Sequence, residues 1–215
     1  AYLDDFLLDG QLHAAVLRSP VAHGRITSID ATDARQMPGV KAVWLHGDIE
    51  DKLAPLVNEF PLNTDFAKIS EPPLAGDTVR YVGQPIAFAV AESRHAAEDA
   101  LESVEIDIEE LPAVAAPDAA LSEDAPQLHR ESPGNLAYTW ECGDAEAVER
   151  AFAGAHRVIA TPVVNQRVAV CSLESRGINV RYLPEDARWE AWISSQGAFG
   201  MRAKISNALG VDQSR

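Results

Sequence analysis

The stretch PIAFAVAESRHAAEDALESVEIDIEEL, residues 85–111, decides the fold of the first half of the chain. It begins with an alternation of larger apolar residues and alanines, which is typical of a strand. Alanines and a leucine then recur at helical spacing, and the last part alternates valine or isoleucine with acidic residues, as a half-buried strand does. The stretch therefore predicts a strand, a helix and a second strand. The residues expected to face inward are Ile86, Phe88, Val90, Ala96, Ala97, Ala100, Leu101, Val104, Ile106 and Ile108.

A second stretch, GRITSIDATDARQMPGVKAVWLHG at residues 24–47, has a related order of patterns. It predicts a strand, a short helix, a turn and another strand. Before it, the alternation in residues 12–18 predicts a further strand, which Pro20 interrupts because proline has no amide donor. We therefore expect residues 1–115 to form an α+β unit with mixed strands.

The remainder of the chain changes character. Residues 112–135 contain four prolines and no sustained period, which predicts an extended linker on the surface. The predicted elements after it are a helix over 143–155, strands over 156–164, 167–183 and 188–196, and a helix over 198–210 that ends at Gly210. The residues of this last helix expected to face the core are Ala198, Met201, Ile205 and Leu209. An α/β unit that stops just after a helix is incomplete, so we expect a further strand beyond Arg215.

The composition is that of a globular protein, with 47% hydrophobic and 24% charged residues. A formal net charge of −15 without a local basic patch argues against nucleic acid as a partner, because the phosphate backbone would repel this surface. No apolar run approaches the roughly 20 residues that span a bilayer, so we expect no membrane contact. Cys142 and Cys171 provide neither a disulfide framework nor metal-ligand spacing, and they fit a reducing, cytoplasmic setting.

Two stretches in the first half combine glycine, proline and polar residues. LRSPVAHGRI (17–26) lies between two predicted strands, and VRYVGQPIA (79–87) leads into a third. Such residues form loops in any protein, so a bend and a strand corner are the simplest interpretations from the residues alone. A contact with a cofactor or a partner domain is the alternative for the second stretch.

Two stretches in the second half contain charged or amide side chains that are candidates for a functional role. CSLESRGINV (171–180) places Glu174 and Arg176 two residues apart on a predicted strand, where an ion pair or a contact between domains is the simplest interpretation. ISSQGAFGMR (193–202) places Gln196 between a predicted strand and a predicted helix. An amide at such a point either caps the helix or faces a ligand, since ligands gather at the carboxyl ends of strands in α/β folds.

Taken in order, these stretches resemble the amino-terminal part of the molybdenum-binding subunit of the xanthine dehydrogenase, aldehyde oxidase and carbon monoxide dehydrogenase family. The matching stretches are YLDDF, GQLHAAVLRSPVAHGRITSID, MPGVKAV, AGDTVRYVGQPIAFAVAES and GD…AFAGAHRVI. The resemblance implies an α+β fold, with an α/β hammerhead domain over residues 1–115 and a linker over 116–135. It implies that residues 136–215 begin a molybdopterin-binding α/β domain, which is incomplete here.

The resemblance also assigns residue roles. The family's usual Met-Glu-Pro-Arg corresponds to Leu-Glu-Ser-Arg at residues 173–176. Gln196 stands where the family has a glutamine that donates a hydrogen bond to an oxo ligand of molybdenum, so it is the expected cofactor-binding residue. His23 and Arg25 are expected to shape the first bend without taking part in chemistry. No catalytic or metal-ligating residue is expected, because nothing here matches the family's general-base glutamate.

The implied activity is the oxidative hydroxylation of a small aldehyde or nitrogen heteroaromatic substrate, with water as the source of oxygen. In the complete protein the molybdenum cofactor, molybdopterin, would carry this chemistry, and electrons would leave through iron–sulfur clusters and FAD on partner subunits or domains. Two cysteines cannot build those clusters. The resemblance implies an oligomer for the full enzyme and no activity for this chain alone. The alternative is a non-catalytic hammerhead module that scaffolds an oxidoreductase complex.

Overall fold

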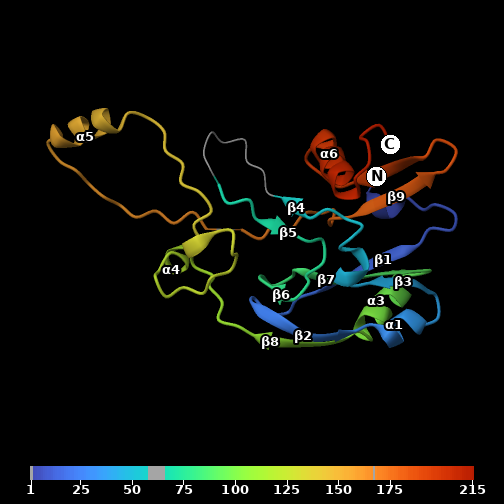
Figure 1. The fold of residues 1–215 in the computed structure, drawn as a ribbon. Coiled ribbons are helices and arrows are strands. Elements are labelled where there is room, and N and C mark those ends of the chain that lie inside the picture. The colour runs from blue at the N-terminus through green and yellow to red at the C-terminus, as the bar shows by residue number, and fades with distance from the viewer. Residues whose placement is uncertain (1, 58–65, 167) are drawn as a thin grey trace.

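The computed structural model describes residues 2–57, 66–166 and 168–215. In the first of two three-stranded sheets, β7 (Pro85–Ala91) lies between β1 (His13–Arg18) and β3 (Val40–Trp44). Helix α3 (Arg94–Glu102) and the short helix α1 (Thr32–Gln36) pack against this sheet (Figure 1). The strand–helix–strand order expected of both sequence stretches is confirmed.

In the second sheet, β2 (Gly24–Asp30) lies between β6 (Thr78–Val79) and β8 (Glu105–Glu110). The strand pairs of both sheets are antiparallel, so the expectation of mixed strands is wrong. A side chain on Gly24 would begin only 2.5 Å from Ile108 Cγ2, so glycine is required where β2 and β8 approach each other. Further short elements of this half and the linker are η1 (Leu3–Asp5), α2 (His46–Ile49), β4 (Leu56–Val57), β5 (Ser70–Glu71) and η2 (Pro133–Asn135).

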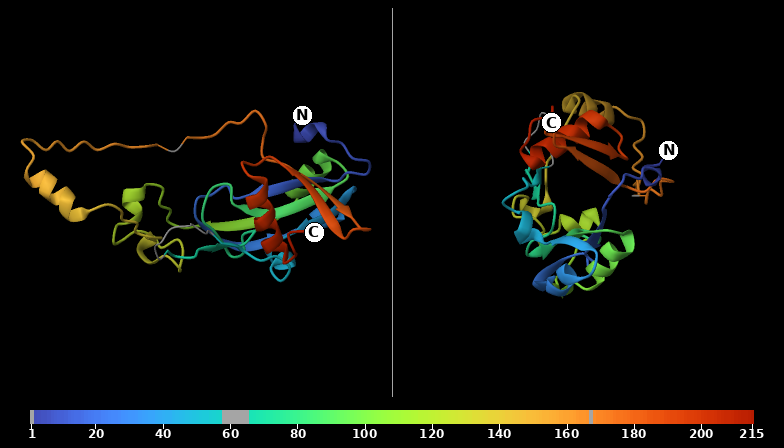
Figure 2. Two further views of the ribbon diagram at one scale, coloured as in Figure 1. Left: turned by 90° about the horizontal axis from the view of Figure 1, so that it is seen from above. Right: turned by 90° about the vertical axis from the view of Figure 1, so that its right-hand side faces the viewer.

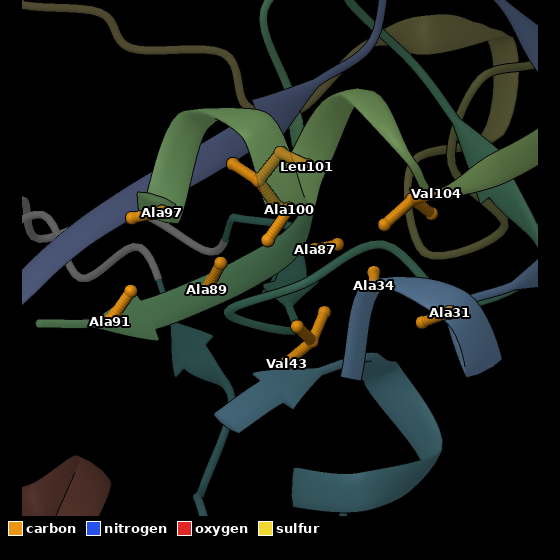
Figure 3. Close-up of a cluster of buried hydrophobic side chains, with 10 residues drawn as sticks. All are labelled: Ala31, Ala34, Val43, Ala87, Ala89, Ala91, Ala97, Ala100, Leu101 and Val104. Carbon is orange, nitrogen blue, oxygen red and sulfur yellow. The ribbon is translucent and has the colours of Figure 1, made fainter. Parts of the chain in front are cut away.

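Alanines line the contact between α3 and the first sheet (Figure 3). Ala87, Ala89 and Ala91 of β7 are fully buried, and they face a helix that presents Ala97 and Ala100, which are also fully buried. Because methyl groups take little space, the helix and the strand pack at short range with no room for a larger side chain. The whole cluster consists of Ala31, Ala34, Val43, Ala87, Ala89, Ala91, Ala97, Ala100, Leu101 and Val104.

The sequence pattern predicts that the larger residues of β7 all face the core, and this holds only in part. Phe88 and Val90 are only half-buried, on the face of the strand opposite the buried alanines. Phe88 stacks on Trp44 of the neighbouring strand, with ring centroids 5.9 Å apart. Ile86 is buried, but in a second, smaller cluster that includes Val79. The expectation of one inward face formed by the large residues of β7 is wrong for these two half-buried side chains.

Residues 112–135 are more ordered than the extended linker that the sequence predicts. They contain a short helix, α4 (Pro117–Ala120). The side-chain amide of Asn135 donates hydrogen bonds to the carbonyl oxygens of Ala120 and Pro126, each at 3.0 Å. Because both acceptors belong to the same segment, the segment folds back on itself. The domain boundaries at residues 115 and 135 stay predictions.

The second half contains a hairpin and two helices, as expected. Strands β9 (Ile178–Leu183) and β10 (Arg188–Ile193) pair in an antiparallel hairpin, followed by α6 (Ala198–Leu209). Gly210 ends α6 at a φ of +63°, which glycine adopts without strain. Helix α5 (Ala145–Ala153) lies well away from both sheets (Figure 2). Within the described residues no helix has the length and apolar character to cross a membrane.

Residues 156–166 and 168–177 form no strand, so the prediction over 156–164 is wrong and that over 167–183 holds only from residue 178. Their apolar side chains are exposed; for example, Val163 is 85% exposed and Leu173 is 97% exposed. An alternating apolar pattern indicates a preference for a sheet, but a strand also needs a neighbour to accept its backbone hydrogen bonds. The part of the chain that the structure describes supplies no such neighbour here.

The inward face expected for α6 is only partly correct. Met201 and Ile205 are half-buried, whereas Ala198 and Leu209 are exposed. Ser206 is buried, and its hydroxyl donates to the carbonyl oxygen of Val211 just after the helix. The packed face is therefore shorter than the sequence predicts, and both ends of the helix remain open.

Replacing a core alanine by leucine tests the close packing of α3 on β7. Ala89→Leu should lower the free energy of unfolding by about 1–3 kcal/mol, because the added carbons have no space in a filled core. Ala191→Leu, at an exposed strand position of β10, is the matched control and should change stability little. Urea denaturation of both variants measures the difference, and equal stabilities would show that the core tolerates a larger residue.

Limited digestion with trypsin tests the difference between the two connecting segments. The first cut should follow Arg157, because the backbone around it belongs to no helix or strand. Arg130 should resist longer, since the Gln127 amide donates to the carbonyl oxygens of His129 and Ser132 on either side of it, both at 2.6 Å. Mass spectrometry of the early fragments identifies the order, and an earlier cut after Arg130 would contradict this assignment.

Candidate functional site

Gln196 lies at the junction between β10 and α6. It follows the end of the strand at Ile193 by three residues and precedes Gly197, the N-cap of the helix. The side chain of Gln196 is exposed and makes no hydrogen bond with any residue that the structure describes. No side chain caps α6, so the amide is not the helix cap that the residue type alone would favour. Its donor is free for a group outside these residues.

The start of α6 offers further donors and open space. The first N–H groups of a helix have no acceptor within the helix, and Gly197 provides no side chain to satisfy them. A methyl group added at Gly197 or Gly200 would meet no atom within 4 Å. Free amide donors beside open space fit an oxygen-rich, negatively charged group. Among the described residues, no group of three or more His, Cys, Asp or Glu side chains could hold a metal ion.

Ser194 ties the junction to the chain that precedes β9. Its hydroxyl oxygen accepts a hydrogen bond from the Gly177 N–H at 3.1 Å. The hydroxyl also lies within donating distance of the carbonyl oxygens of Ser175 and Gly177, at 3.3 and 3.4 Å. The Ser194 N–H in turn donates to the Gly177 oxygen at 3.3 Å. These bonds fix the chain at Ser194, two residues before Gln196.

Glu174 and Arg176 do not form the strand pair that the sequence suggests. Both lie in the segment before β9, and no ion pair joins them among the residues described. Glu174 instead accepts a hydrogen bond from the backbone N–H of Leu3 at 2.8 Å. This contact joins segments 171 positions apart, which agrees with the interpretation of a contact between domains. Arg176 is exposed.

The first bend is anchored by His23. This side chain is only 9% exposed, and its Nδ1 lies 2.7 Å from the carbonyl oxygen of Pro112, which can only accept, so Nδ1 carries the proton. Arg25 pairs with Glu109 at 3.1 Å on the surface, where such a pair adds little stability. His23 therefore anchors the bend to the start of the linker, as expected, whereas Arg25 only pairs across the strands β2 and β8.

The second glycine–proline stretch is a strand corner that meets the first bend. Gly83 has a φ of +90°, which only glycine adopts readily. Gln84 is buried, and its side-chain oxygen accepts from the Arg80 N–H at 2.7 Å. The Ser19 N–H donates to the backbone carbonyl oxygen of Gln84, and the Gly83 N–H donates to the backbone carbonyl oxygen of Ser19, both at 2.8 Å. These bonds join the two stretches, so the interpretation as a structural corner is confirmed.

Two residues near this corner, His129 of the linker and Tyr81, have shifted pKa values. Arg80 Nε donates to the Leu128 carbonyl oxygen at 2.8 Å, and the neighbouring His129 is partly buried. Burial, and then the charge of Arg80, lower the pKa of His129. Burial, and then the charge of Glu71, raise the pKa of Tyr81. Both residues are therefore favoured in their neutral forms.

Comparison with known families covers most of the chain. Residues 1–112 match the profile described as the a/b hammerhead domain of aldehyde oxidase and xanthine dehydrogenase. The chain belongs to this family. Residues 128–215 match the profile of the molybdopterin cofactor-binding domain, so the aldehyde oxidase and xanthine dehydrogenase fold expected from the sequence is confirmed. Gln196 lies in the part that matches the cofactor-binding domain.

Two curated relatives show how much of the family's length is present. The nicotine 6-hydroxylase large subunit of Paenarthrobacter nicotinovorans is 38% identical over 214 residues, which is 100% of this chain and 26% of that protein. The carbon monoxide dehydrogenase large chain of Hydrogenophaga pseudoflava is 33% identical and covers 100% of this chain and 27% of that protein. The chain therefore spans about a quarter of the length of these relatives.

Solved structures agree with this assignment over both halves. Quinoline 2-oxidoreductase from Pseudomonas putida 86 matches 99% of this chain and 27% of its own, with a TM-score of 0.85 and 33% identity. The Cu,Mo-CO dehydrogenase matches 100% of this chain and 28% of its own, with a TM-score of 0.85 and 30% identity.

Sequence reasoning missed the side chains that hold the Gln196 junction in place. Ser194 and Asn179 carry no signal of their own, because serine and asparagine are common in loops and edge strands. The contact of Asn179 with Leu3 spans 176 positions, and no local pattern reports it. Only the glycine at position 177, where the junction is tied, could have drawn attention as a point of close approach.

A comparison of the exposed Gln196 with the buried Gln84 tests whether Gln196 contributes to the stability of the fold. Gln196→Ala should change the free energy of unfolding by less than about 1 kcal/mol, because the side chain is exposed and unbonded. Gln84→Ala should lower it by about 1–3 kcal/mol, because the half-buried Arg80 backbone N–H loses its acceptor. Thermal or urea unfolding of both variants gives the comparison. A loss at Gln196 as large as that at Gln84 would make it a structural residue.

Proposed function

We propose that this chain forms the hammerhead domain and the first part of the molybdopterin-binding domain of a molybdenum hydroxylase subunit. The proposed reaction is oxidative hydroxylation of a small molecule, with water as the source of oxygen. The observation that carries the proposal is the exposed, unbonded amide of Gln196, placed at the open start of α6 within the part that matches the cofactor-binding domain.

A nitrogen heteroaromatic compound is the favoured substrate class, with an aldehyde as the second. Two of the similar proteins are named for such compounds, nicotine and quinoline, and they are 38% and 33% identical to this chain. A third similar protein is named for carbon monoxide, which is neither. The choice of substrate rests on these names.

The residues of this chain would hold the cofactor and leave the chemistry to it. When bound, the molybdenum cofactor supplies the two-electron oxidation and the activation of water. Gln196 would donate its amide hydrogen bond to an oxygen ligand of the metal, and the free N–H groups at the start of α6 would add a positive dipole end. A donor fixed in advance stabilises charge without reorganising, which is how an enzyme gains most from a single hydrogen bond.

The electrons would pass to iron–sulfur clusters and FAD on partner subunits or domains, in an oligomeric full enzyme. The names of the relatives as a large subunit and a large chain support such an assembly. A cytoplasmic location fits the two cysteines, both free and exposed at positions 142 and 171.

The role of Gln196 is tested in the full-length subunit assembled with its partners. Gln196→Ala should lower turnover of a nitrogen heteroaromatic substrate by about a hundredfold, because a fixed donor is lost at the reacting centre. The molybdenum content of the purified enzyme should be measured in the same samples. Gln213→Ala, at an exposed position beyond α6, is the matched control and should leave both quantities unchanged.

The outcomes separate the proposal from its alternative. If Gln196→Ala retains the turnover and molybdenum content of Gln213→Ala, Gln196 does not contact the cofactor. If the unchanged full-length protein holds no molybdenum and oxidises neither heteroaromatic compounds nor aldehydes, the chain is a scaffold of an oxidoreductase complex instead.

A further inference from the structure

We propose that residues 2–6, here called the docking segment, hold Gln196 in its working position through Leu3, Gly177 and Ser194. The segment precedes the first sheet, whereas Gln196 belongs to the second half of the chain (Figure 1). The inference deepens the proposed function and rests on it, because it concerns how the cofactor-facing amide is positioned. It makes Asn179, Gly177 and Ser194 positioning residues, which act through Gln196.

The backbone of Leu3 is held on both sides by the second half of the chain. Its carbonyl oxygen accepts a hydrogen bond from the Asn179 amide at 2.9 Å, and its N–H donates to Glu174 at 2.8 Å. The Asn179 side-chain oxygen accepts in turn from the Gln11 amide at 3.4 Å, between the docking segment and β1. Two bonds to one residue from different side chains fix both the place and the direction of the docking segment.

The Leu3 side chain lies directly on the backbone of Gly177. A methyl group added at Gly177 would meet Leu3 Cδ1 at 3.2 Å, which is closer than most carbon contacts in proteins. Glycine therefore leaves the space that the leucine occupies. Because Gly177 immediately precedes β9, the docking segment presses on the start of the hairpin.

Gly177 passes this constraint to the junction through Ser194. The two residues exchange hydrogen bonds in both directions, from the Gly177 N–H to the Ser194 hydroxyl at 3.1 Å and from the Ser194 N–H to the Gly177 oxygen at 3.3 Å. Gln196 lies two residues beyond Ser194. Its side chain makes no hydrogen bond within the described residues that would fix it. The position of its backbone therefore depends on this pair.

Two further contacts hold the docking segment, one to the hairpin and one to the hammerhead. Phe6 stacks on Trp192 of β10, with ring centroids 6.1 Å apart and planes 25° from parallel. Asp4 pairs with Arg94 at the start of α3 at 3.2 Å. The ion pair is exposed and contributes little stability, but it places the docking segment between the two halves of the chain. The docking segment thus contacts α3 of the hammerhead as well as the hairpin.

The variant that tests the inference is Asn179→Ala in the full-length subunit assembled with its partners. It removes a docking bond without touching Ser194 or Gln196. Asn207→Ala, an exposed asparagine on α6, is the matched control. Asn179→Ala should lower kcat about tenfold with a much smaller change in KM, because a misplaced catalytic donor slows the reaction step and does not weaken substrate capture.

A second readout does not depend on activity. Hydrogen exchange of the backbone amides at 175–197 should become faster in Asn179→Ala than in Asn207→Ala, because the start of the hairpin loses its support. Phe6→Ala removes the stacking contact and should have the same effect on exchange. If exchange and kcat in Asn179→Ala both equal those of the control, the docking segment does not position the junction.

The double variant Asn179→Ala/Gln196→Ala separates this inference from the proposed function. If Asn179 acts through Gln196, its tenfold effect on kcat should disappear when Gln196 is already alanine. Independent multiplication of the two effects would overturn the positioning role while leaving a cofactor role for Gln196. If Gln196→Ala alone leaves turnover unchanged, the proposed function fails, and the exchange measurement still decides whether the segment docks.

Discussion

The close contact of α3 with β7 is the interaction on which the rest of the structure depends. Five fully buried alanines allow a helix and the central strand of the first sheet to meet without a gap. Because β7 pairs with both β1 and β3, this contact fixes all three strands at once. The position of β1 in turn limits where the residues before it, which include the docking segment, can lie.

The strand–helix–strand order could be predicted from the sequence because it depends on neighbours within a few positions. The choice of inward face could not, because an apolar pattern does not say how much space lies opposite. The preference for Phe88 and Val90 over alanine as core residues assumed that large side chains fill interiors. Here the opposing helix is itself lined with alanine, so the small face of β7 is the one that fits.

Local sequence patterns likewise predict only part of the candidate site. Gln196 could be placed between a strand and a helix because both elements have clear periods. The strand expected at 156–164 does not form, and the strand expected at 167–183 forms only from residue 178. In both cases the apolar alternation is present, but no partner strand lies beside it in the described residues. The contact between Leu3 and Asn179, at 176 positions, depends on the folded arrangement of both halves, which no window of sequence contains.

The separation of these two residues also has a consequence in time. A ribosome adds about 5–20 residues per second, so on the order of ten seconds pass between the synthesis of Leu3 and that of its hydrogen-bond partners Glu174 and Asn179. The hammerhead can fold in that interval, since its last strand ends at Glu110. Residues 2–6, although made before the hammerhead strands, must remain undocked on a domain that is already folded. An early segment of the chain is thus among the last to reach its final position, and the exposed Leu7, at 81%, shows that apolar surface beside it stays open to other contacts.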